Sequence, residues 1–303
     1  MTIRSIRYAA EAAALRLSLA LSSVVPRGVL LGAGSVAGWI GYALDRRHRR
    51  IALRNLELAY GSQIDPRGAS RLVRESWRHF GRITLDSFTI FRSPLDKLER
   101  FVEYEGLENI RKAYDRGKGV LLFSAHYGHW ELTALMQGHM NLPLVLITRP
   151  LDNPRLERML ARLRERSGNR VIHKRSAVPE MLRALRERIG VAIVIDQDAR
   201  GEGVFVPFFG RPASTTPTLA LLALRTGAAV VPTFSIPQPN GSYRIVYEPE
   251  IEVRDTGNRD RDILELTATC TAVIEKWVRR HPELWLWMHR RWKTAPPAGQ
   301  SRC

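Results

Sequence analysis

The sequence predicts an α/β fold in which helices flank a mostly parallel central sheet, preceded by a helical N-terminal membrane anchor. From about residue 119 onward, short runs of aliphatic residues alternate with segments whose apolar residues recur every three or four positions. Strands that alternate with helices of this length form βαβ units, which build parallel sheets covered on both faces. The anchor is predicted from the apolar composition of the first 44 residues.

The individual elements follow from local periodicity. Short apolar runs predict strands at 120–124, 144–148, 171–173, 191–195, 230–236 and 243–247. Amphipathic spacing predicts helices at 66–91, interrupted near Gly81, and at 130–138, 153–167, 178–189, 217–226 and 262–280. Without an internal repeat or long linker, we expect an anchoring segment at 1–50, one α/β domain at 51–295 and a disordered tail at 296–303.

The charge balance narrows the class of partner. Lys and Arg outnumber Asp and Glu by 47 to 30, a formal net charge of +17, so phospholipids, phosphorylated substrates, acidic proteins and nucleic acids are candidates. A hydrophobic content of 45% excludes a disordered chain. The two cysteines, Cys270 and Cys303, form no disulfide framework, which predicts a reducing, cytosol-facing environment.

The N-terminal segment predicts contact with a membrane. Its apolar run is interrupted by Glu11, Arg16, Pro26 and Arg27, so the longest uncharged stretch only reaches the lower limit for a span. A basic cluster at 46–50 follows, suited to anionic headgroups on the cytoplasmic side. The alternative is an amphipathic helical hairpin packed on the domain.

The sequence "GVLLFSAHYGHWE" carries the candidate catalytic residues. His126 follows a predicted strand, at the carboxyl edge where parallel sheets bind ligands. A histidine removes a proton from a hydroxyl more readily when a carboxylate holds its other ring nitrogen, and Glu131 is close enough in sequence to do so. Alternatively, His126 is a satisfied loop histidine and Glu131 a first-turn carboxylate favoured by the helix dipole.

Other chemistries have weaker support. His129 completes a His-x-x-His-x-Glu pattern that could ligate a metal, but no further ligand cluster accompanies it. The Gly-x-Ser-x-Gly elbow of serine hydrolases is absent from the sequence. The glycines of "GAGSVAG" at 32–38 lack the lysine of a nucleotide loop, so helix packing explains them better.

Four segments in this order resemble one family. They are "HYGHWE", "ITRPLDNPRLERML" with Arg149, "IDQDARGEGVFVPFFGRPASTTPTLALLALRTGAAVVP" with Asp196 and Asp198, and "PELWLWMHRRWKTAP". Together they resemble the bacterial lipid A biosynthesis (late) acyltransferase family, of the lauroyl and myristoyl type with a His-x4-Asp/Glu motif. The resemblance extends from about residue 53 to residue 296.

The resemblance implies a fold like that of glycerolipid acyltransferases and a specific reaction. A fatty acyl chain would move from acyl carrier protein to a hydroxyl of an acylated lipid A precursor, at the cytoplasmic face of the bacterial inner membrane with its anionic lipids. His126 would act as general base and Glu131 as its orienting partner. Direct attack on the thioester would require no acyl-enzyme, metal or other cofactor.

The remaining site candidates lie after strand ends. Arg149 could bind phosphate or polarise the thioester carbonyl, or be a surface arginine, and the same alternatives hold for Lys174 and Arg175. Asp196 and Asp198 close the strand at 191–195, where we expect a positioning or structural role more than proton transfer. The segment "FVPFFG" would line an acyl groove, form a lid or belong to the core.

Rival functions differ in acceptor, donor or class. Within acyltransferases, the acceptor could be a glycerophosphate or lysophospholipid, an aminoacyl lipid or a phosphatidylinositol mannoside, and acyl-CoA could replace acyl carrier protein. The mannoside enzymes usually carry Asp where this chain has Glu131, which favours lipid A. The ending "WLWMHRRWK" suits a membrane interface or a nucleic-acid-binding protein, with His289 structural, but no nucleic-acid motif accompanies it.

Overall fold

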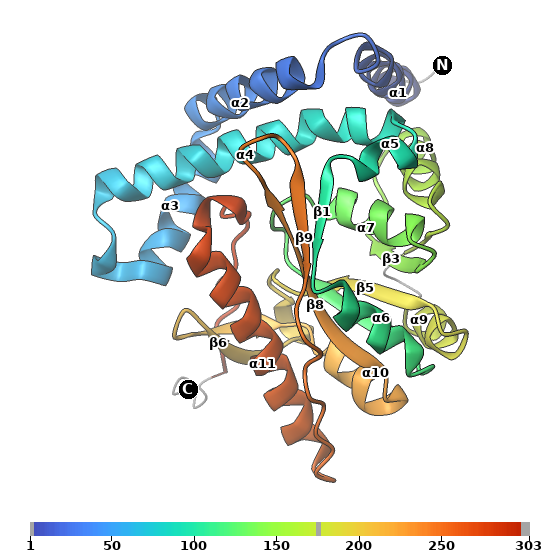
Figure 1. Cartoon of the computed structure of the whole chain (residues 1–303). Helices are drawn as coiled ribbons and strands as arrows, with labels where there is room; N and C mark the ends of the chain where they lie inside the picture. Colours follow the sequence, from blue (N-terminus) through green and yellow to red (C-terminus); the bar gives the residue numbers. More distant parts are fainter. Residues whose placement is uncertain (1–2, 174–176, 298–303) are drawn as a thin grey trace.

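A computed structural model describes residues 3–173 and 177–297 and contains a seven-stranded sheet covered by helices on both faces (Figure 1). The strand order across the sheet is β1-β9-β8-β2-β5-β3-β4. The strands are β1 (Val102–Glu105), β2 (Val120–Ser124), β3 (Leu144–Thr148), β4 (Arg170–His173), β5 (Gly190–Val194), β8 (Ala229–Pro237) and β9 (Tyr243–Tyr247). This arrangement confirms the predicted α/β class.

Neighbouring strands of the sheet are parallel except for one pair. β8 and β9 are antiparallel, so β9 and its parallel neighbour β1 run against the other five strands. All six predicted strands are present, with bounds that differ by at most one residue from the prediction. β1 was not predicted, because it is a four-residue edge strand in which two of the residues are exposed glutamates.

The helices occupy the positions that amphipathic spacing predicted, with additions. They are α1 (Ile3–Leu21), α2 (Arg27–Leu44), α3 (Arg46–Tyr60), α4 (Pro66–Arg92), α5 (Leu95–Glu99), α6 (Leu107–Asp115), α7 (Trp130–His139), α8 (Pro154–Glu165), α9 (Ala177–Arg186), α10 (Thr218–Thr226) and α11 (Arg259–Arg280). Single 3₁₀ turns lie at Gly61–Gln63, Arg200–Glu202 and Pro282–Leu284. A separate antiparallel hairpin joins β6 (Val204–Phe208) to β7 (Arg211–Thr215).

Side-chain alternation along the strands divides the core into two halves. On β2, Leu121 and Phe123 pack with α9, α10 and α11, whereas Val120 and Leu122 point to the opposite face, towards α6 and α7. Both faces are apolar because helices cover both, as expected for parallel strands. The second face also carries the candidate site described below.

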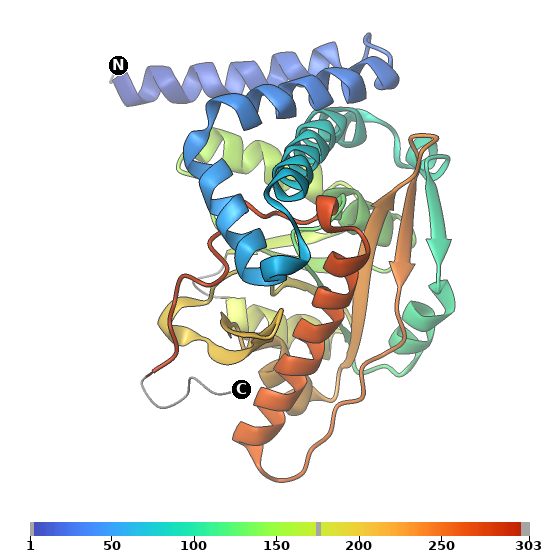
Figure 2. The same ribbon diagram turned by 90° about the vertical axis from the view of Figure 1, so that its left-hand side faces the viewer.

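α1 and α2 lie across one end of the molecule with α4 beneath them (Figures 1 and 2). α2 crosses α4 at glycines: a Cβ on Gly81 would lie 2.2 Å from the carbonyl oxygen of Gly34, and one on Gly38 would lie 2.2 Å from that of Trp77. The predicted interruption near Gly81 is therefore wrong, because α4 is continuous and this glycine lets two backbones touch. The helix-packing interpretation of the glycines at 32–38 is confirmed for Gly34 and Gly38.

The predicted membrane anchor is not supported as a span. None of the helices in the described part of the chain is sufficiently long and apolar to traverse a bilayer. The charges that weakened the prediction lie within or at the start of these helices, at Glu11 and Arg16 in α1 and Arg27 in α2.

Two tryptophans and an arginine of the tryptophan-rich ending belong to the core. Trp285, Trp287 and Arg291 are fully buried. The Arg291 guanidinium donates to the carbonyl oxygen of Ser214 at 2.6 Å, and Phe208 packs edge-on against Trp285. The sequence suggested a membrane or nucleic-acid surface because composition does not reveal burial. The "FVPFFG" segment is likewise core at Phe208 and Phe209.

Candidate active site

His126 lies in the turn after β2, and its partner comes from the neighbouring strand. Ser124 of β2 is paired with Val194 of β5, so two residues further along each chain His126 lies beside Asp196. His126 Nδ1 is 2.9 Å from Asp196 Oδ1, and the backbone N–H of His126 donates to Oδ2 of the same carboxylate at 2.9 Å. One carboxylate therefore fixes both the ring and the backbone of the histidine.

The pair is electrostatically asymmetric. Burial alone would lower the pKa of His126, but the Asp196 charge and hydrogen bond outweigh it and raise the pKa above the usual value. Burial likewise opposes ionisation of Asp196, but the charge and hydrogen bonds of His126, joined by a 2.8 Å bond from Trp285 Nε1, lower its pKa to about 2. Asp196 thus stays ionised, and His126 Nε2 is left to accept a proton.

Glu131 does not orient His126, which corrects the sequence prediction. Its carboxylate instead forms a two-point ion pair with Arg164 of α8, with Nη2–Oε1 at 2.5 Å and Nε–Oε2 at 3.0 Å. The first turn of α7 directs Glu131 towards α8, while β5 already supplies the carboxylate for His126. Glu131 nonetheless contributes to the electrostatic environment that raises the pKa of His126.

His126 opens onto a cavity of about 310 Å³ between the sheet and helices α7 and α8. The imidazole is partly accessible, with 22% of its side chain exposed, and the Trp130 ring lies edge-on to it at 5.5 Å. Part of the cavity lining is apolar, with Leu122, Leu144, Leu146, Ala192 and Leu160. A histidine that lines a partly apolar cavity suits a substrate with a reactive polar end and a hydrocarbon tail.

Of the other predicted site residues, Arg149 lines the cavity and Asp198 does not. Arg149 is exposed and lines the cavity beyond the end of β3. Asp198 accepts hydrogen bonds from the backbone N–H and the hydroxyl of Thr294. Its own backbone N–H donates to His289 Nε2, so Asp198 and His289 both hold the C-terminal segment in place. Arg175 and Lys174 lie outside the described residues.

His129 has a capping role. It is the N-cap of α7, and its Nδ1 accepts the backbone N–H of Leu132 at 3.4 Å. The ring packs edge-on against Tyr243 at 5.2 Å. Within residues 3–173 and 177–297, no group of three or more His, Cys, Asp and Glu side chains is arranged to hold a metal ion.

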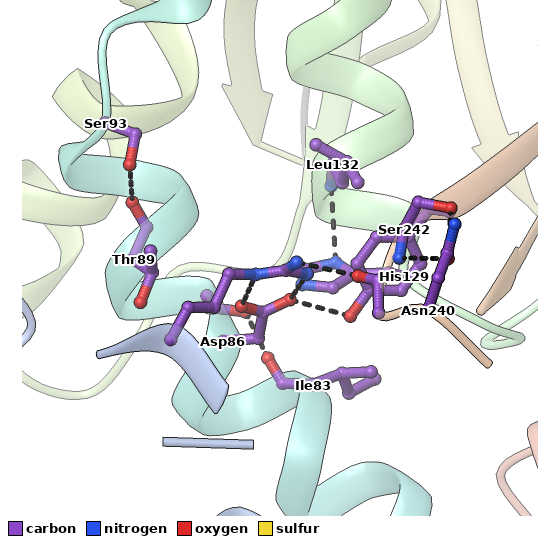
Figure 3. A network of polar contacts seen from close by, with 12 residues as sticks. Ile83, Asp86, Thr89, Ser93, His129, Leu132, Asn240 and Ser242 are labelled. Atoms are coloured by element: carbon purple, nitrogen blue, oxygen red, sulfur yellow. Dashed lines mark hydrogen bonds and ion pairs between the residues drawn. The ribbon is translucent and has the colours of Figure 1, made fainter. Parts of the chain in front are cut away.

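A buried ion pair joins the N-terminal helices to this region (Figure 3). Arg27 of α2 binds both carboxylate oxygens of Asp86 in α4, at 2.7 and 2.6 Å, and donates to the carbonyl oxygen of Gly241. The Tyr243 hydroxyl donates to Asp86 at 2.7 Å. The contact of Tyr243 with the His129 ring then connects α2, α4 and β9 to the turn that carries His126.

Sequence reasoning missed Arg164 and Trp285. Arg164 looked like any basic residue in the last turn of a helix, and Trp285 like part of an interfacial cluster. The signal for Trp285 was its place in a matched segment, but only the folded chain shows its indole N–H bonded to Asp196.

Comparison with known proteins identifies the family of the chain. The model of the bacterial lipid A biosynthesis acyltransferase family matches residues 3–294. The chain is 29% identical to the lipid A biosynthesis palmitoleoyltransferase of Escherichia coli K12 over 275 residues, which cover 90% of this chain and 87% of that protein. It is 29% identical to the lauroyltransferase of the same organism over 282 residues, 92% and 90% of the two chains.

The name of a more distant relative specifies an acceptor other than lipid A. The phosphatidylinositol mannoside acyltransferase of Mycolicibacterium smegmatis is 25% identical over 228 residues, 73% of this chain and 72% of that protein. The longer and stronger matches are to the lipid A enzymes, and the family model covers nearly the whole chain. The chain therefore belongs to the bacterial lipid A biosynthesis acyltransferase family and is an acyltransferase.

Proposed function

We propose that this enzyme transfers a fatty acyl chain from acyl carrier protein to a hydroxyl of an acylated lipid A precursor, at the cytoplasmic face of the bacterial inner membrane. The observation that carries the proposal is the His126–Asp196 pair, whose partly exposed imidazole lines a cavity with an apolar wall. The names of the relatives that match over nine tenths of the chain support the acceptor.

The mechanism follows from the orientation of the imidazole. With Nδ1 held by Asp196, His126 Nε2 removes the proton from the acceptor hydroxyl as its oxygen attacks the thioester carbonyl. Asp196 stabilises the imidazolium that forms, and the imidazolium then protonates the leaving thiolate. Glu131 and Arg164 hold α7 and α8 together along the cavity wall, and Arg149 offers a cation to a substrate phosphate at the rim.

The acyl chain of the donor would occupy the apolar part of the cavity. Leu122, Leu144 and Ala192 belong to adjacent strands and Leu160 to α8, so the chain would lie between the sheet and the helix. Acyl carrier protein is acidic, and the net charge of +17 supports its attraction to the enzyme. An acyl-CoA donor would present the same thioester.

The N-terminal helices would rest on the membrane surface. Nine of the fourteen exposed large apolar side chains among the described residues belong to the first 44 residues, Trp39 at 51% exposure and Leu17 at 60% among them. The basic start of α3 follows directly. Apolar side chains together with nearby arginines suit an anionic membrane surface. Asn153, before α8, donates to the backbone carbonyl of Tyr8 and to the Glu11 carboxylate of α1, so α1 is attached to the part of the domain that carries α8.

The decisive experiment is transfer, in detergent, of a radiolabelled acyl group from acyl carrier protein to a tetraacylated lipid A precursor. We expect labelled product with the wild type and none with His126→Ala, whose fold is checked by circular dichroism. Product with phosphatidylinositol mannoside or a lysophospholipid, but not with the lipid A precursor, would reassign the acceptor. Turnover by His126→Ala at the wild-type rate would refute the mechanism.

Membrane attachment is tested separately by vesicle flotation. The wild type should float with vesicles that contain phosphatidylglycerol, and the double variant Leu17→Asp/Trp39→Asp should remain at the bottom of the gradient. Val178→Asp, an exposed apolar residue on α9, serves as the control and should float normally. Equal flotation of all three proteins would show that α1 and α2 do not carry the attachment.

A further inference from the structure

Two hydroxyls on β8 are buried beside the candidate base without a hydrogen-bond partner. The Thr233 and Ser235 side chains are 3% and 1% exposed, and neither hydroxyl bonds to any group in the described part of the chain. Both residues line the cavity onto which His126 opens. Burying a hydroxyl unpaired costs stability, and most buried polar groups in folded proteins are paired.

The strand pattern directs both side chains to the cavity. Val230 and Phe234 of β8 belong to the core half that contains α10 and α11. Thr233 and Ser235 alternate with them, so they point to the other face, where α7 and α8 enclose the cavity. Two hydroxyls thus stand in line on one strand.

The register places these hydroxyls next to the catalytic turn. Phe123 of β2 is paired with Pro232 of β8, which sets Ser124 beside Thr233. Two residues further, Ser235 lies against the turn of His126, where a Cβ on Gly128 would be 1.7 Å from the Ser235 carbonyl oxygen. β2, with His126 beyond its end, therefore has Asp196 on the β5 side and the two hydroxyls on the β8 side.

We infer that the Thr233 and Ser235 hydroxyls form the oxyanion site for the thioester carbonyl of the acyl donor; this inference rests on the proposed acyl-transfer function. The acceptor oxygen bonds to the carbonyl carbon as His126 Nε2 takes its proton, and the carbonyl π electrons move to oxygen. The hydroxyls donate to that oxyanion. When the carbonyl reforms, the C–S bond breaks and the thiolate takes the proton from His126.

Other donors around the cavity are less suitable. The Arg164 guanidinium is already bound at two points by Glu131. Arg149 and the unpaired Thr148 hydroxyl lie at the end of β3, two strands from β2 and about 10 Å away at the usual strand spacing. Thr233 and Ser235 are on a strand directly adjacent to β2, on the cavity side.

The test uses Thr233→Val and Ser235→Ala, which remove each hydroxyl with little change of shape. We expect kcat for acyl transfer to fall about 10²-fold in each variant, with the KM for the acyl donor nearly unchanged, because the bond strengthens only as the oxyanion develops. Both variants should unfold at the wild-type temperature or higher, since they lose an unpaired buried hydroxyl.

Thr267→Val is the matched control. Thr267 is also 3% exposed with an unpaired hydroxyl, but it lies in α11, outside the cavity. It should show the same thermal behaviour as Thr233→Val and the wild-type kcat. Unchanged kcat in Thr233→Val and Ser235→Ala, or a change in donor KM alone, would overturn the oxyanion assignment. A wild type without transfer to any acceptor would instead refute the proposed function.

Discussion

Asp196 accepts hydrogen bonds from both the backbone N–H and the ring of His126, at 2.9 Å each. Because a single carboxylate contacts the residue at two points, the imidazole cannot turn without breaking a bond to a buried charge. The orientation of the imidazole is thus set by Asp196, two residues beyond the end of β5, a strand distant from His126 in sequence but paired with β2 in the sheet.

Asp196→Asn should lower kcat by about 10²–10⁴-fold, because the amide neither fixes the tautomer nor stabilises the imidazolium. Only neutral His126 acts as a base, so activity is lost as pH falls through its pKa, which Asp196 raises. The acid limb of the kcat/KM profile should therefore lie above pH 6.5 in the wild type and move to lower pH in the variant. A limb at the same pH in both proteins would assign it to another group.

Glu131 and Arg164 should act as a unit. We expect Glu131→Ala and Arg164→Ala each to impair transfer and lower the free energy of unfolding by roughly 2 kcal/mol, because each leaves a charge of the opposite sign largely buried. Glu131→Asp should retain part of the activity. Chemical denaturation of both single variants and the double variant provides the coupling energy. Additive losses would show that the ion pair contributes nothing of its own.

The crossing of α2 and α4 predicts opposite effects for two glycines of the same helix. Gly38→Ala should lower the free energy of unfolding by about 1–3 kcal/mol, since its methyl group would meet the Trp77 backbone. Gly32→Ala should raise it by up to about 1 kcal/mol, because nothing lies within 4 Å and alanine favours helix. Thermal denaturation of the two variants checks the prediction, and equal shifts would contradict the close approach.

His79 should make the fold acid-sensitive. Burial, with a contribution from the neighbouring His129, lowers its pKa to about 3. Between pH 6.5 and pH 3 the unfolded chain binds this proton and the folded chain does not, so the free energy of unfolding falls as pH decreases. The slope approaches about 1.4 kcal/mol per pH unit. His79→Gln should reduce that slope, which chemical denaturation of both proteins at a series of pH values would measure; an equal slope in both would assign the acid sensitivity to other groups.

Local patterns predicted most of the fold. Strands such as β2, β3 and β9 have the predicted bounds because their apolar runs end at turn residues. What local patterns could not provide was the order of strands, since adjacency in the sheet depends on packing of the whole chain. Predicting the partner of His126 from sequence distance therefore selected Glu131, whereas β5 brings Asp196 to it.

Burial of individual side chains was the second property that local sequence patterns could not predict. Trp285 and Arg291 are residue types that are common at membrane and nucleic-acid surfaces. In the folded chain each has a hydrogen-bonding partner inside the core, Asp196 for Trp285 and Ser214 for Arg291. Glycine often interrupts a helix, but Gly81 lies within a continuous helix, where its backbone packs closely against Gly34 of α2. For each of these residues the sequence gives the side-chain type, but its role depends on which segment, distant in sequence, packs against it.

The buried ion pair of Arg27 and Asp86 has a consequence for the order in which parts of the protein can pack during synthesis. Arg27 also donates to the carbonyl of Gly241, 214 residues later in the chain, and Ser76 of α4 donates to the carbonyl of Trp285, 209 residues later. Contacts across such long sequence separations form late. α2 and α4 therefore gain these two hydrogen bonds only after Gly241 and Trp285 have been synthesised, so the N-terminal helices cannot complete their packing before those residues are present.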